Sequence, residues 1–218
     1  MDILITGPSD GIGRATAEYF LERGHSVVGF DRKPPALAHP NYRHEILDIC
    51  DADAYPEDVQ PEILINNAGV QDSGRDIEIN LMGTIRITEK YAIANPRIRA
   101  VVMVGSASAH TGSEFPEYAA SKGGLLTYTK NAALRLAPRA VCNSIDPGGV
   151  LTDLNRPVME DPELWDQIMA LTPLRRWATP EEIAEWIYFV GVRNRFMTGQ
   201  NLLIDGGEAG DAHFVWKD

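Results

Sequence analysis

A tyrosine and a lysine four positions apart, Tyr118 and Lys122, are the residues best suited to proton transfer in this sequence. They fall at the start of a predicted helix over residues 117–137, so their side chains leave the same face of that helix, one turn apart. A tyrosine ionises at about pH 10, and a neighbouring ammonium group lowers that pKa toward the range where the phenol exchanges a proton with an alcohol or a ketone. Taken alone, such a pair can also be accidental on an exposed helix face.

Ser106 reduces the weight of that alternative. It directly follows the apolar stretch 100–105, which predicts a buried β-strand over residues 99–105. Residues at the carboxyl ends of parallel strands face the ligand crevice. We therefore expect the Ser106 hydroxyl to hold a substrate oxygen while Tyr118 moves the proton.

A glycine turn near the amino terminus joins a predicted strand, residues 2–6, to a predicted helix, residues 12–23. The first glycine permits a sharp turn, the later ones remove side chains where phosphates approach, and the helix N-terminus supplies N–H groups and a positive dipole end. We interpret this turn as a pyrophosphate cradle, with a purely structural turn as the alternative. The residues assigned to it are Gly7, Ser9, Gly11, Ile12 and Gly13.

Asp31 ends the predicted strand over residues 26–30, about 20 residues after the glycines, where such a site binds the adenosine ribose hydroxyls. It favours NAD. The adjacent Arg32 and Lys33 leave NADP as the alternative, because cations can hold a 2′-phosphate that the Asp31 carboxylate would repel.

These residues need a framework that brings strand ends together, and the alternation of strand-like and helix-like segments predicts one. The fold class is α/β: a doubly wound parallel sheet, Rossmann-like, in three α/β/α layers. We expect residues 1–218 to form one domain. Further predicted strands are 43–47, 62–66, 140–145 and 201–204, and further predicted helices are 76–94, 161–170 and 180–191.

Composition narrows the partners. The formal net charge of −11 disfavours nucleic acid and anionic membranes, and no stretch approaches the roughly 20 apolar residues that span a bilayer. We expect a cytoplasmic protein that acts on a small molecule. The five histidines are scattered without the spacing of metal ligands, so we expect no metal, and Cys50 and Cys142 are interpreted as ordinary apolar residues.

The ordered set of motifs resembles the short-chain dehydrogenase/reductase family over nearly the whole chain. The matching motifs are Thr6-Gly7-x-x-x-Gly11-x-Gly13, Asn66-Asn67-Ala68-Gly69, Asn80, Ser106, Tyr118-x-x-x-Lys122, Pro147-Gly148 followed by Thr152, Thr198-Gly199-Gln200-Asn201, and Asp205-Gly206-Gly207. The resemblance implies an oxidoreductase that transfers a hydride between NAD(H) and a secondary alcohol or ketone. A non-catalytic dinucleotide-binding sensor or scaffold is the alternative, although none of the four residues that carry the chemistry is lost.

The resemblance assigns those four roles. Tyr118 would be the general acid or base, Lys122 would lower its pKa and hold the nicotinamide ribose, and Ser106 would orient the substrate oxygen. Asn80 would hold a water that links Lys122 to solvent, with a helix amide bonded to backbone as the alternative.

The resemblance also extends the cofactor site. Asp48 would bind the adenine amino group, unless it is a turn or cap residue, and Ile49 would lie near the ring. Asn67, Ala68 and Gly69 would pass beneath the cofactor. Val150 and Thr152 would meet the nicotinamide amide.

The substrate side is less determined by the sequence. We expect His110, Leu151 and Leu154 to border the substrate, with His110 as a pocket wall or surface residue, and a lid over about residues 150–175 whose apolar side chains fit a substrate or the sheet equally well. The family's association mode implies a homodimer or homotetramer, although the connections 48–61 and 69–80 are short for it. The tail 208–218 is either a frayed terminus or a segment that docks on a neighbouring subunit or caps a site.

Overall fold

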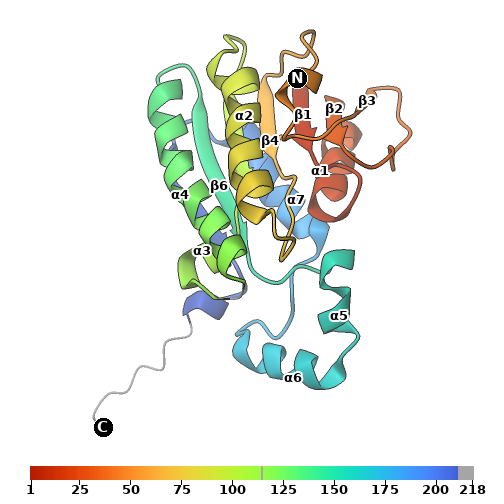
Figure 1. Cartoon of the computed structure of the whole chain (residues 1–218), viewed down its shortest axis with the longest axis vertical. Helices are drawn as coiled ribbons and strands as arrows, with labels where there is room; N and C mark the ends of the chain where they lie inside the picture. Colours follow the sequence, from red (N-terminus) through yellow and green to blue (C-terminus); the bar gives the residue numbers. More distant parts are fainter. Residues whose placement is uncertain (114, 211–218) are drawn as a thin grey trace.

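The computed structural model describes residues 1–113 and 115–210, and its centre is a seven-stranded parallel sheet (Figure 1). The order across the sheet is β3-β2-β1-β4-β5-β6-β7. The strands are β1 (Asp2–Thr6), β2 (Ser26–Asp31), β3 (Tyr42–Ile46), β4 (Ile63–Asn66), β5 (Ala100–Val104), β6 (Val141–Pro147) and β7 (Asn201–Ile204). The chain therefore builds outward from β1 to one side and then crosses back to β4, which confirms the doubly wound class.

The strand sequences explain why helices cover both faces. Ile3 and Ile5 of β1 lie in one apolar cluster, whereas Leu4 between them lies in the other. Because successive strand residues point to opposite faces, an unbroken apolar strand needs cover on both sides. The sheet is thus the middle of three layers.

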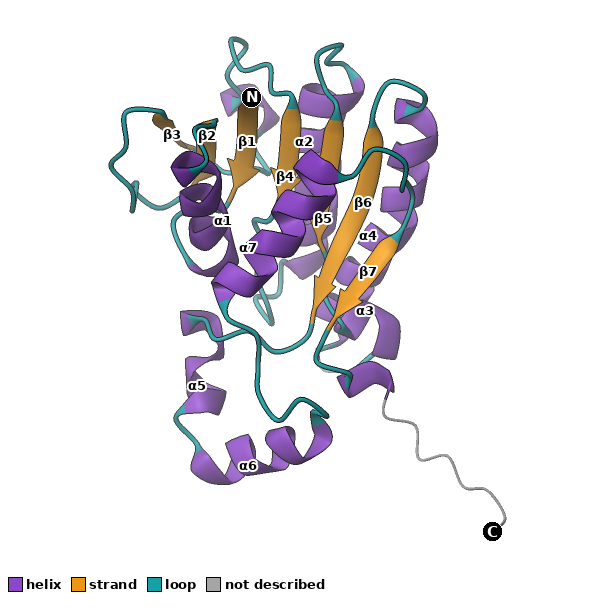
Figure 2. Cartoon of the chain, turned by 180° about the vertical axis from the view of Figure 1, so that it is seen from behind, coloured by secondary structure: helices purple, strands orange, loops and turns teal. Residues whose placement is uncertain are grey.

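One face carries α1 (Gly11–Glu22) and α7 (Pro180–Tyr188), which lie side by side in front of the sheet in Figure 2. The other face carries α4 (Pro116–Leu136) and a continuous helical segment composed of η2 (Ile77–Gly83), α2 (Thr84–Thr88) and η3 (Glu89–Ile93). The π-helical turns of η2 and η3 are features that the apolar periodicity of residues 76–94 did not indicate.

Local signals place the helix ends. Thr179 caps α7 by accepting a hydrogen bond from Glu182 N, and Glu182 Oε2 accepts from Thr179 N at 2.9 Å, with Pro180 in the first turn. This reciprocal pair is a capping box. After α1, Gly24 adopts a φ of 76°, a left-handed conformation that ends the helix.

The carboxyl ends of the strands point toward the short helices at the lower edge in Figure 2. These are α3 (Ser108–Thr111), η4 (Asp153–Asn155), α5 (Arg156–Met159), α6 (Pro162–Leu171) and the single turn η6 (Glu208–Gly210), which follows β7; η1 (Ala52–Ala54) is a single turn after β3. Residues 211–218, which hold most of the predicted tail, lie outside the described residues. Among the residues that are described, no helix is long and apolar enough to cross a bilayer.

Candidate active site

The glycine turn is closed by contacts within the protein. Gly7 and Gly11 have φ values of 70° and 48°, which residues other than glycine rarely adopt. A Cβ at Gly13 would lie 2.0 Å from Gly7 O and 2.4 Å from Asn67 Nδ2. The missing side chain at Gly13 therefore makes room for the turn itself, and its place beside a phosphate stays a prediction.

The turn delivers the N-terminus of α1 to the edge between β1 and β4, where the order of the strands reverses. Asp10 precedes the helix without a side-chain cap on its first N–H groups, and Ile12 lies in the first turn. Thr152, at the start of the predicted lid, packs on this turn, since a Cβ at Gly11 would lie 3.1 Å from its Cγ2. Uncapped N–H groups at a strand-order reversal suit a pyrophosphate.

Asp31 is fixed at the end of β2. Its Oδ2 accepts a hydrogen bond from Ser9 N at 3.0 Å, and its Oδ1 accepts from Lys33 N at 2.9 Å. The Lys33 ammonium is paired with Asp10, and Arg32 Nε lies 3.9 Å from Asp48 Oδ2. Both cations next to Asp31 therefore face carboxylates.

The predicted adenine contacts follow β3. Asp48 accepts a hydrogen bond from Cys50 N at 2.8 Å, so it makes the turn that was its alternative role and keeps a partly exposed carboxylate. Ile49 is only 5% exposed and packs against Gly83, where a Cβ would lie 2.9 Å from its Cδ1. The Ile49 side chain thus belongs to the core, and its place near an adenine ring stays a prediction.

Residues 67–69 are tied to the glycine turn. Thr6 Oγ1 accepts hydrogen bonds from Asn67 N and Ala68 N, both at 3.0 Å, and Asn67 Nδ2 donates to Thr6 O and Gly7 O. The segments that follow β1 and β4 are therefore joined directly by hydrogen bonds.

The Lys122 ammonium group lies close to the Val104 carbonyl and the Tyr118 ring. Its Nζ donates to Val104 O at 2.9 Å and lies 5.8 Å from the centre of the Tyr118 ring. The residue is 5% exposed, and burial lowers the pKa of its ammonium group from 10.5 to about 8. Tyr118 is partly exposed one helical turn earlier. The helical spacing thus brings the two side chains together as predicted.

Ser106 follows β5 two residues after Val104, and it is 9% exposed. Its Oγ accepts from Ser108 N at 3.2 Å and lies 3.2 Å from Ser108 Oγ. The hydroxyl is therefore held by the first turn of α3.

Asn80 lies in the π-helical turn η2. Its Nδ2 donates to Val70 O and Ser121 Oγ, and its Oδ1 accepts from Val70 N at 2.8 Å. A Cβ at Gly69 would lie 3.1 Å from Asn80 Oδ1 and 3.5 Å from Lys122 Nζ. The Asn80 amide thus bonds to backbone, as in its alternative interpretation, and also reaches the helix that carries Lys122.

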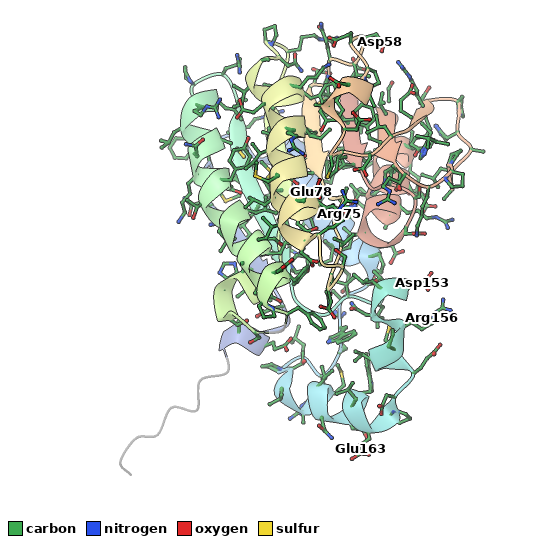
Figure 3. The ribbon with its side chains drawn as sticks, viewed as in Figure 1. Asp58, Arg75, Glu78, Asp153, Arg156 and Glu163 are labelled. Carbon is green, nitrogen blue, oxygen red and sulfur yellow. The ribbon has the colours of Figure 1, made fainter. Side chains whose placement is uncertain are left out.

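The short 69–80 connection is closed by Asp76, a residue that the sequence analysis did not single out. Its carboxylate is fully buried and accepts hydrogen bonds from Asp72 N, Ser73 N and Ser73 Oγ. Arg75 and Glu78 pair on the surface beside it, 2.9 Å apart (Figure 3). A buried carboxylate bonded to its own loop therefore closes the connection directly before the helical segment that carries Asn80.

A second missed residue is Asp146, near the end of β6. Its side chain is fully buried, and its Oδ2 lies 2.7 Å from His110 Nε2 on α3. Burial raises the pKa of this carboxyl group, and the hydrogen bond with His110 opposes that rise. The signal in the sequence is an acidic residue just before Pro147-Gly148, at the carboxyl end of an apolar strand.

The predicted lid begins where Val150, which is buried, forms a bridge with Ala178. Leu151 and Leu154 follow with exposures of 39% and 62%, so both present apolar surface. Asp153 and Arg156 pair with each other at the beginning of α5 (Figure 3). Among residues 1–113 and 115–210, no three His, Cys, Asp or Glu side chains gather as metal ligands would.

Comparison with known proteins gives the family. Residues 62–208 match the family model described as enoyl-(acyl carrier protein) reductase. The chain belongs to this branch of the short-chain dehydrogenase/reductases, and it is an oxidoreductase by family.

Relatives and solved structures extend the likeness to almost the whole chain. The chain is 29% identical to the 3-oxoacyl-(acyl-carrier-protein) reductase of Thermotoga maritima, over 94% of this chain and 96% of that protein. It is 28% identical to the L-rhamnose 1-dehydrogenase (NAD(P)(+)) of Azotobacter vinelandii, over 94% and 95%. A 4-hydroxyisoleucine dehydrogenase complexed with NADH superposes with a TM-score of 0.89 at 27% identity, covering 97% and 99% of the two chains.

Proposed function

We propose that this chain transfers a hydride between NAD(H) and a secondary alcohol or ketone, with Tyr118 as the general acid or base. The observation that carries the proposal is the buried Lys122 ammonium, 5.8 Å from the centre of the Tyr118 ring. A nearby cation stabilises the phenolate, which is the form that accepts a proton from an alcohol. When bound, the nicotinamide cofactor supplies or accepts the hydride.

The remaining roles are those that the family resemblance implies, and the positions of the side chains support them. Ser106 orients and polarises the substrate oxygen, Lys122 also binds the nicotinamide ribose, and Asn80 holds the loop at Val70 against the helix of Lys122. We assign cofactor contacts to the glycine turn, Asp31, Asp48, residues 67–69, Val150 and Thr152. Residues 150–175 would act as the substrate lid of a single domain, with His110, Leu151 and Leu154 beside the substrate.

The preference for NAD rests on charges around Asp31. Its carboxylate is held by Ser9 N and Lys33 N, and Lys33 is paired with Asp10. A 2′-phosphate would meet a fixed carboxylate and a cation that is already neutralised. The relatives differ in their cofactors: the 4-hydroxyisoleucine dehydrogenase is complexed with NADH, whereas the L-rhamnose 1-dehydrogenase is named for NAD(P)(+).

Assembly into a homodimer or homotetramer is supported by apolar surface beside the edge strand β7. Trp186 and Phe189 are 44% and 49% exposed and stack edge to face, with ring centres 6.2 Å apart. Sedimentation of the purified protein tests this, and a monomer at micromolar concentration would contradict it.

The function is tested by Tyr118→Phe, with Tyr128→Phe on the same helix as the matched control. A panel of alcohols and ketones with both dinucleotides, followed at the nicotinamide absorbance, identifies a substrate first. We expect Tyr118→Phe to lower kcat by about 100-fold or more while NAD binding is kept, because only the proton-transfer group is removed. Full activity of Tyr118→Phe would refute the mechanism, and dinucleotide binding without turnover in any pairing would favour the sensor alternative.

A further inference from the structure

Asp146 is a buried carboxylate that the proposed reaction does not use. Its side chain is fully buried, and its Oδ1 has no hydrogen-bond partner among the described residues. Buried polar atoms of this kind are rare in folded proteins, because an unpaired acceptor loses its hydration without compensation. An acid kept in such a place calls for a reason beyond packing.

The backbone on both sides of Ser106 is hydrogen-bonded to the backbone on both sides of Asp146. Gly105 N donates to Ile145 O at 2.8 Å and Ala107 N donates to Pro147 O at 2.7 Å, so the residues flanking Ser106 bond to the residues flanking Asp146. A Cβ at Gly105 would lie 2.0 Å from Asp146 Oδ1. The hydrogen bond from His110 to Asp146 then closes the turn 105–110 onto β6.

The same carboxylate belongs to the surroundings of Lys122. Lys122 Nζ is bonded to Val104 O, and Val104 pairs in register with Ile145, the residue before Asp146. Two acidic groups, Asp146 and Asp76, favour the charged form of Lys122 against the effect of burial on its pKa. Asp76 accepts three hydrogen bonds from its own loop, whereas Asp146 has one oxygen without a donor.

We propose that Asp146, held by His110, is a positioning residue of the active site: it fixes the turn that carries Ser106 and supplies buried negative charge to Lys122. Besides His110 on α3, the titratable group whose charge acts on Asp146 is Lys122 on α4, and Asp76 before η2 also acts on Lys122. The proposal rests on the proposed function only in that Ser106, Tyr118 and Lys122 act on the substrate.

The first test measures the charge of Lys122 without turnover. The sequence contains five lysines, so a protein labelled with carbon-13 at the lysine Cε positions gives few signals, and Lys122→Arg assigns the one of interest. Asp146→Asn keeps the shape and an acceptor for His110 but removes the charge. We expect the titration midpoint of Lys122 to fall by about one pH unit in Asp146→Asn, because an opposite charge that favours the ammonium form is lost. His39→Ala, in the loop after β2, should leave the midpoint unchanged. An unchanged midpoint in Asp146→Asn overturns the proposal.

The second test measures the turn, and it remains available where Asp146→Asn does not fold. We expect His110→Ala to speed amide hydrogen exchange in residues 105–110 and to lower kcat by about tenfold with little change in KM, whereas His110→Gln, which keeps an N–H donor, restores most of both. Wild-type exchange and kcat in His110→Ala overturn the proposal. Because the midpoint and the exchange need no substrate, an inactive wild type would refute the proposed function and still leave this pair testable.

Discussion

Replacing the buried lysine by methionine should make the protein more stable and inactive. Lys122 is 5% exposed, and burial lowers its pKa from 10.5 to about 8. At about 1.4 kcal/mol per pH unit, this difference means that the charged lysine destabilises the folded state by about 3 kcal/mol. Lys122→Met removes that penalty with a side chain of similar length, and it leaves Val104 O without a donor, which costs about 1 kcal/mol.

The expected net gain in the free energy of unfolding is therefore about 2 kcal/mol at pH 7. The dependence of this gain on pH tests its physical origin. As the pH rises from about 8 to 10.5, the folded wild type has lost its Lys122 proton while the unfolded chain still binds one, so the stability of the wild type rises and the gain from Lys122→Met shrinks.

Urea unfolding of the two proteins at pH 7 and pH 10 measures both effects. Lys130→Met, at an exposed position of the same helix, is the matched control and should change stability little at either pH. A Lys122→Met protein that is less stable than the wild type at pH 7, or whose gain does not depend on pH, would refute the reasoning. Activity should be lost in the same variant, because Tyr118 has no ammonium neighbour there.

Three further outcomes are expected. Gly13→Ala should weaken NAD binding by about tenfold or more and lower the free energy of unfolding by about 1–3 kcal/mol, because its Cβ would lie 2.0 Å from Gly7 O. Gly123→Ala is the control: its Cβ would have no neighbour within 4 Å, so it should not destabilise the protein. Dinucleotide titration and urea unfolding measure the two effects. Asp31→Ser should raise the ratio of kcat/KM with NADP to that with NAD by about tenfold or more, and an unchanged ratio in initial rates would exclude Asp31 as the discriminating group. Burial lowers the pKa of His25, so the folded protein binds this proton less readily than the unfolded chain does. Stability should therefore fall as the pH drops below about 6.5, and less so in His25→Phe, as urea midpoints at pH 7 and pH 5 will show.

The strands and long helices could be predicted because each is encoded locally. Helix α4 was expected over residues 117–137 and spans Pro116–Leu136, and a helix was expected over residues 180–191, where α7 spans Pro180–Tyr188. Helices α3 and α5 were missed because four residues contain barely one helical turn and no apolar period. The switch point between β1 and β4 then follows from the order of the elements.

The features of the candidate site also divide into those that local sequence predicts and those that depend on contacts between distant residues. The proximity of Tyr118 and Lys122 follows from helical spacing, but the link between His110 and Asp146 spans 36 residues and exists only because β5 and β6 are neighbours. The closure of the 69–80 loop by Asp76 was hidden for a different reason, since an aspartate before a helix is read as an ordinary cap. The catalytic and cofactor roles assigned to these residues stay predictions until the variants above are measured.

Three glycines at the carboxyl edge of the sheet share a physical role that motif reading assigns to the ligand. A Cβ at each would come close to a polar side chain: 2.4 Å from Asn67 Nδ2 at Gly13, 3.1 Å from Asn80 Oδ1 at Gly69, and 2.0 Å from Asp146 Oδ1 at Gly105. Each pair joins two segments that meet at this edge, so amide and carboxylate groups hold these segments together. Since a packed, hydrogen-bonded edge cannot shift one residue without disturbing the next, small changes at these glycines should disturb proton transfer and dinucleotide binding together.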